Sequence, residues 1–206
     1  MKSFYYFLIV LVVGIFSCTD SRKMTYNESL SLPINSEFAD FGFTVRGYFQ
    51  SSKLTDALNI PSDARVEKFS IVGFSLLVEP QIGNEADWIR YALDFNCGEP
   101  VACRLLENQL RFVGGGEKFN LTSELNGKHL TRLRCQLEYM VSEGRLGQQC
   151  VSGDIEYQFQ LKTFDAFSNP KKFVGKVTGF LNVQVSYSVC EDFPKGLFSD
   201  FVKCDD

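Results

Sequence analysis

Apolar and polar side chains alternate one by one along most of this chain, and this period restricts the fold more than any other feature. In residues 41–49, Phe41, Phe43 and Val45 share one parity, whereas Thr44 occupies the other. Successive side chains of a strand point to opposite faces, so the period predicts strands with one buried face. Seven segments show this alternation or a more apolar form of it: 41–49, 66–79, 88–95, 105–113, 133–141, 155–163 and 176–190.

Seven predicted strands with few helices indicate an all-β fold, an antiparallel β-sandwich of Ig-like or jelly-roll-like type with short helical connections. The predicted connection 51–65 has room for one or two helical turns. We expect 66–79 and 88–95 to pair as a hairpin, because a turn through Gly83 and Asn84 joins them.

The first eighteen residues carry the clearest signal of where the protein is located in the cell. Lys2 is followed by an uninterrupted apolar run at 4–16, which is too short to span a membrane but matches the apolar region of a cleaved signal peptide. The run ends in Ile15-Phe16-Ser17-Cys18, which resembles the lipobox of bacterial lipoproteins. The resemblance implies acylation of Cys18 and cleavage before it. The alternative is an ordinary secretory signal in which Cys18 has no role; both interpretations export the protein.

The leader also sets the expected domain organisation. We predict a cleaved signal peptide at 1–17, a polar lipid-attached tether at 18–37 and a single β-sandwich domain at 38–206. The residue after Cys18 is Thr19 rather than Asp, so the retention signal for the inner membrane is absent. The resemblance therefore favours anchoring in the outer membrane of the cell envelope, on a face that the sequence leaves open.

Six cysteines remain beyond Cys18, and an even number in an exported chain predicts disulfides. Their spacing favours local pairs, although six cysteines allow many connectivities. Close Cys pairs and interspersed His, which zinc sites require, are absent, so we expect no metal. The favoured pairs are Cys97–Cys103, Cys135–Cys150 and Cys190–Cys204.

Charge and composition exclude several classes of function. The net charge is −4, and loss of Lys2 with the leader makes it −5, which argues against nucleic-acid binding through a basic patch. His129 is the only histidine, so a Ser-His-Asp site would depend on it; we interpret it as an ordinary surface residue. Gly114-Gly115-Gly116-Glu117-Lys118 lacks the spacing of a phosphate-binding loop and predicts a turn. We expect no cofactor.

Three predicted strands carry an aromatic residue on their outward, polar parity. Tyr48 is flanked by Thr44 and Arg46, Trp88 by Arg90, and Phe180 by Thr178 and Asn182. Aromatic rings among hydrogen-bonding side chains suit sugar stacking or a protein hot spot. If the strands are adjacent, a binding face for a glycan or protein partner results, formed by these residues: Tyr48, Trp88, Arg90 and Phe180.

The preferred hypothesis is therefore a lipid-anchored, non-enzymatic β-sandwich that binds a partner or assists a surface structure. Two alternatives stay open. A small glycan hydrolase would use two of the carboxylates Glu79, Asp87, Asp94 and Glu99. A lipid-carrying barrel like the lipocalins would need a Gly-x-Trp in its first strand, where this chain has Gly42-Phe43-Thr44.

Overall fold

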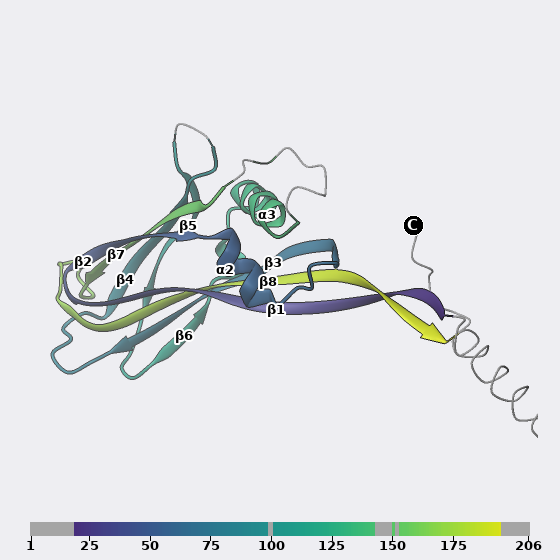
Figure 1. The fold of residues 1–206 in the computed structure, drawn as a ribbon. Coiled ribbons are helices and arrows are strands. Elements are labelled where there is room, and N and C mark those ends of the chain that lie inside the picture. Colours follow the sequence, from purple (N-terminus) through teal and green to yellow (C-terminus); the bar gives the residue numbers. More distant parts are fainter. Residues whose placement is uncertain (1–18, 99–100, 143–149, 151–152, 195–206) are drawn as a thin grey trace, which may run out of the picture.

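The computed structural model describes residues 19–98, 101–142, 150 and 153–194, and within them the predicted all-β sandwich is confirmed (Figure 1). Two four-stranded antiparallel sheets face each other. One consists of β1 (Thr19–Asp40), β8 (Phe173–Pro194), β3 (Arg65–Pro80) and β6 (Glu117–Asn120), in that order. The other consists of β2 (Gly42–Phe49), β7 (Ile155–Phe164), β4 (Trp88–Phe95) and β5 (Cys103–Arg111).

The strand order is that of a jelly roll. Every connection crosses from one sheet to the other except the one between β4 and β5, which pair as a hairpin. This interleaving of two four-stranded sheets distinguishes a jelly roll from an Ig-like sandwich. The predicted hairpin of 66–79 with 88–95 is wrong, because β3 and β4 lie in different sheets. The closed lipocalin-like barrel is also wrong, since the strands form two separate sheets.

The segment 133–141, predicted as a strand, belongs instead to helix α3 (Gly127–Ser142). The buried side chains Leu133, Leu137, Met140 and Val141 recur at i, i+4, i+7 and i+8, which is the spacing of one helical face. Asn126 precedes the helix, and its side-chain oxygen accepts hydrogen bonds from the backbone N–H groups of residues 128 and 129. This N-cap starts the helix.

The segment expected to be an irregular tether is a strand from Thr19 onward. β1 pairs with β8 residue by residue over its whole length, without a bulge. Leu30, Leu32 and Ile34 share one parity and face the core. The alternation of apolar and polar side chains therefore extends into the segment whose composition predicted a polar tether. The described part of the predicted tether, residues 19–37, therefore belongs to strand β1.

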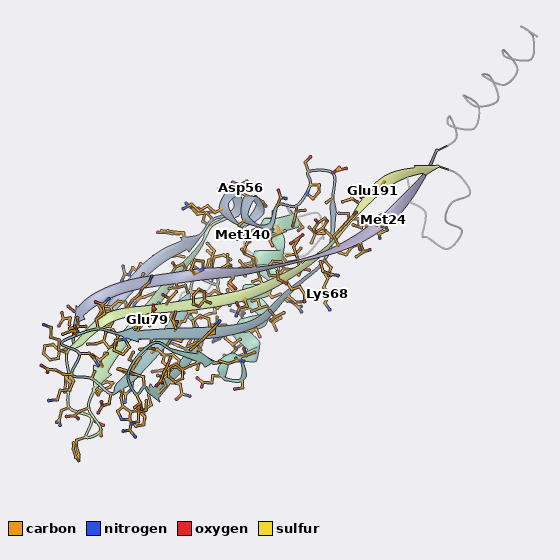
Figure 2. All side chains as sticks on the ribbon, turned by 90° about the horizontal axis from the view of Figure 1, so that it is seen from below. Met24, Asp56, Lys68, Glu79, Met140 and Glu191 are labelled. Carbon is orange, nitrogen blue, oxygen red and sulfur yellow. A yellow bond between two sulfur atoms is a disulfide. The ribbon has the colours of Figure 1, made fainter. Side chains whose placement is uncertain are left out.

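The first residues of β1 and the last residues of β8 form a two-stranded ribbon that projects beyond the rest of the sandwich (Figures 1 and 2). β3 joins β8 only at Ser188, so residues 19–24 and 189–194 pair with each other alone. At the base of the ribbon the Tyr26 and Tyr187 rings stack at 5.6 Å, and the Tyr26 hydroxyl donates to Glu191 of the ribbon at 2.5 Å. The ribbon is thus held by side chains as well as by the backbone.

The helices α2 (Ser51–Leu58) and α3 lie near the end of the sandwich from which the ribbon projects (Figure 1). α2 follows β2 and buries Leu54 and Leu58, which confirms the predicted helical turns. A short 3₁₀ helix, η1 (Thr122–Glu124), precedes α3. The core between the sheets is rich in aromatic residues, and its largest fully buried side chains include Phe69, Phe74, Tyr91, Phe95, Phe159 and Phe173.

Two of the favoured disulfides are present. Cys97–Cys103 closes the loop between β4 and β5, and Cys135–Cys150 ties α3 to the chain that leads into β7. Cys190 in β8 is also disulfide-bonded. Its predicted partner Cys204, Cys18 and most of the predicted tail helix at 193–202 lie outside the described residues.

Candidate binding surfaces

Tyr48 lies beside a hollow at the open edge of the sandwich. It stands near the end of β2, and 58% of its surface is exposed. The adjacent hollow has a volume of about 380 Å³, within the range of small-molecule sites. It is bounded by the edge strand β1, the end of β2 and the helix α2, through Leu30, Ser31, Leu32, Pro33, Phe49, Gln50, Lys53, Leu54, Ala57 and Tyr157.

Tyr157 forms a fixed wall of this hollow. Its ring lies 4.8 Å from that of Phe49, and its hydroxyl covers Gly47, where an added Cβ would come within 2.5 Å of the hydroxyl oxygen. Burial raises the pKa of the Tyr157 phenol. The wall is therefore a neutral aromatic group with one hydroxyl. Lys53 is the one charged residue that lines the hollow.

Trp88 and Arg90 lie at the opposite end of the same sheet. Trp88 is half-buried and pairs with Phe164 of β7, while Tyr48 pairs with Glu156. These two β7 residues are eight positions apart, which corresponds to about 26 Å along a strand. The Arg90 guanidinium lies 5.3 Å from the centre of the Phe164 ring, a cation–π contact. Trp88 and Arg90 therefore form a surface of their own.

Phe180 lies on the other sheet. It stands in β8 between Pro33 of β1 and Ser75 of β3, and the Lys118 ammonium lies 5.6 Å from the centre of its ring. Uncharged polar side chains continue this face along β1 and β8, where Ser31 donates to Asn182 at 2.7 Å. Phe180 therefore does not share a face with Tyr48, Trp88 and Arg90, whose partners in β7 have one parity of the other sheet. The alternation predicts parity within a strand but not the sheet to which the strand belongs.

The three candidate carboxylates that the structure describes, Glu79, Asp87 and Asp94, do not assemble into a pair. Asp94, at the end of β4, forms an ion pair with Arg104, which also binds Glu107; the hydrogen bond to Asp94 raises the Arg104 pKa. Asp87 precedes the other end of β4, and Glu79 lies in the other sheet. Glu99 is outside the described residues. Of the three candidate acids that the structure describes, Asp94 is the buried one, and its charge is compensated by Arg104.

His129 has a structural role at the start of α3. Its Nδ1 lies 2.6 Å from the carbonyl oxygen of Arg104, which joins the helix to β5. Among the described residues, no three His, Cys, Asp or Glu side chains gather as a metal site would require. None of the described helices combines the length and the apolar character needed to cross a membrane.

The sequence did not predict a fourth surface, which lies at the end of the sandwich away from the ribbon. Four connections meet there: the β1–β2 turn, and the loops at 81–87, 112–116 and 165–172. Each exposes one large apolar side chain. Four of the seven such side chains in the described part of the molecule lie at this end, and we call it the loop end. They are Phe41, Ile82, Val113 and Phe167.

Comparisons with known proteins give no family. No family model matches the chain, and no curated protein matches it. Similar solved structures include viral proteins. One from Desmodium yellow mottle tymovirus is 7% identical, covers 83% of this chain and 90% of its own, and has a TM-score of 0.34. The BFDV capsid protein is 13% identical over 80% and 99% of the two chains, with a TM-score of 0.33. Turnip yellow mosaic virus gives 14% identity over 86% and 96%, with a TM-score of 0.29.

Proposed function

We propose that this chain is an exported, lipid-anchored jelly-roll protein that binds a glycan or protein partner and has no catalytic role. The exposed Tyr48 ring beside its hollow is the observation that carries the proposal. An aromatic ring that is more than half exposed next to a concave, mainly apolar surface offers a stacking platform. Lys53 and Gln50 at the same hollow supply hydrogen-bonding groups.

Export and anchoring rest on three supporting features. Disulfides such as Cys97–Cys103 are typical of proteins in oxidising compartments. The residues before Cys18 resemble a lipobox leader. β1 begins at Thr19, immediately after the cysteine that the resemblance identifies for acylation, so an anchor there would attach to the ribbon end of the domain.

The hydrolase alternative receives no support from the candidate carboxylates in the described part of the chain. Glycosidases hold two carboxyl groups about 5–10 Å apart. Asp87 and Asp94 flank β4 at opposite ends, about 24 Å of strand apart, and Asp94 is paired with Arg104. We therefore keep the binding function alone.

Membrane fractionation with a binding screen tests this proposal. The wild-type protein should fractionate with membranes when expressed in a bacterium, and Cys18→Ala should leave that fraction. In a screen against envelope glycans and surface proteins, Tyr48→Ala should lose at least tenfold in affinity for a ligand that the parent chain binds. Phe180→Ala, on the other sheet, is the matched control and should keep the affinity. Membrane retention of Cys18→Ala, or equal binding by Tyr48→Ala, contradicts the proposal.

A further inference from the structure

Backbone hydrogen bonds join the connections of the loop end to one another and to β7. The N–H of Thr163 donates to the Phe41 carbonyl at 3.1 Å, and that of Glu85 donates to the Lys172 carbonyl at 2.9 Å. The N–H of Phe112 donates to the Asp87 carbonyl at 3.0 Å. These bonds connect the β1–β2 turn to β7, the 165–172 loop to 81–87, and 81–87 to 112–116. The four apolar side chains therefore project from one hydrogen-bonded platform.

Phe167, 86% exposed, is the most exposed aromatic side chain among the described residues, and its loop is held in place locally. The Asp165 carboxylate accepts the backbone N–H groups of Phe167 and Asn169, each at 2.9 Å, and the side-chain amide of Asn169 at 3.0 Å. These hydrogen bonds lower the pKa of Asp165, and the bond from the side-chain amide of Asn169 contributes most. The loop thus presents the Phe167 ring to solvent on an ordered turn, although nothing in its own fold covers the ring.

We propose that the loop end inserts its four apolar side chains into the interfacial layer of a zwitterionic lipid bilayer. The core of a protein interface is a contiguous apolar patch, whereas these side chains stand on separate loops with polar residues between them, such as Asn84, Ser168 and Asn169. A bilayer surface suits that arrangement, because hydrocarbon can close around each side chain while headgroups hydrogen-bond the polar loop surface.

Charge indicates which lipid surface fits. The loops and the residue before Phe41 contain four carboxylates, Asp40, Glu85, Asp87 and Asp165, but only two lysines, Lys171 and Lys172. Polybasic segments, which anionic lipids attract, are therefore absent from these loops. Headgroups that carry both signs match this mixed surface better than anionic headgroups do.

The loop end and the ribbon lie at opposite ends of the domain. Met24 and Glu191 mark the ribbon, and Glu79, the residue before the last of β3, lies far from both, toward the loop end (Figure 2). An anchor at Cys18 would place the loop end on the side of the domain that faces away from its own membrane. This orientation rests on the proposed function, whereas lipid binding by the loops does not. With the anchor, the protein would bridge two bilayers.

Vesicle co-sedimentation of the unacylated chain, residues 19–206, tests the proposal. The hydrophobic core contains no residue before Leu30, so this chain keeps its whole described core. It should bind phosphatidylethanolamine–phosphatidylcholine vesicles, with no gain on adding phosphatidylglycerol and no loss at 0.5 M salt. Ile82→Ser with Phe167→Ser should weaken binding about a hundredfold, because each buried large apolar side chain accounts for about tenfold.

The chain supplies a matched control for side-chain type and exposure. Val113, at the loop end, is 70% exposed, and Val101, at the other end of the sandwich, is 77% exposed. Val113→Ser should weaken vesicle binding about tenfold, and Val101→Ser should leave it unchanged. Absence of vesicle binding, equal effects of the two valine variants, or binding that appears only with phosphatidylglycerol overturns the proposal. Loss of ligand binding at Tyr48 would leave these vesicle results unaffected.

Discussion

At the scale of single residues, Gly175 in β8 occupies a position that other residues fit poorly. Its φ is +152°, and an added Cβ would lie 2.3 Å from the backbone oxygen of Glu79. Gly175→Ala should therefore lower the free energy of unfolding by about 1–3 kcal/mol, measured by urea denaturation. Gly127→Ala is the control, since its Cβ would meet open space at the start of α3. The control should be neutral or stabilising by up to about 1 kcal/mol; equal losses in both variants would contradict the strain argument.

Glu67 gives the ribbon a pH-dependent contact. Hydrogen bonds from Lys23 and Ser188 lower its pKa below the ordinary 4.5, and the ion pair to Lys23 is 2.7 Å long. A lowered pKa in the folded state means that this stabilisation is complete above pH 4.5 and is lost as the pH falls through the lowered value.

Glu67→Gln should accordingly reduce the free energy of unfolding at pH 7 by at most about 1 kcal/mol, since both side chains are about one-third exposed. The difference from the wild-type protein should shrink toward zero at pH 2.5 and in 1 M salt. Thermal unfolding of both proteins across this pH range measures it. A difference that is the same at pH 2.5 and pH 7 would mean that the ion pair contributes nothing.

At the scale of elements, Asn126 determines where α3 begins. Its side-chain oxygen accepts the backbone N–H groups of Lys128 and His129 at 3.1 and 3.2 Å. Asn126→Ala should cost about 1 kcal/mol of stability, observed as a lower urea midpoint. Asn126→Asp keeps an acceptor oxygen at the cap and should recover most of the loss. If both substitutions cost the same, the cap does not stabilise the helix.

Six of the eight strands follow from the sequence, and the errors have identifiable causes. In 133–141, the positions of Leu133, Leu137 and Val141 fit both the period of a strand and the spacing of a helical face. Only the burial of Met140, which a strand would point to the opposite face, identifies the segment as a helix. β1 escaped prediction because Ser, Asn and Thr fill its outward parity, which resembles a linker in composition. Strand parity identified Tyr48 as exposed, but the sheet that holds each strand depends on contacts distant in sequence.

At the scale of the whole molecule, the two ends of the sandwich differ. The ribbon lies at one end and follows directly on Cys18, and the loop end exposes four apolar side chains at the other. The Tyr48 hollow lies between α2 and β1, nearer the ribbon. The proposed anchor and the two proposed contact surfaces therefore lie at different places on the domain.

The intact mass of the protein extracted from bacterial membranes tests the central claim most directly. Measured with alkylation before and after reduction, it should match residues 18–206 with a diacylglyceryl group and an N-acyl chain on Cys18. Cys97, Cys103, Cys135 and Cys150 should accept alkyl groups only after reduction. An unacylated mass, or thiols at these positions that react without reduction, would contradict the account of an exported, lipid-anchored and disulfide-bonded protein.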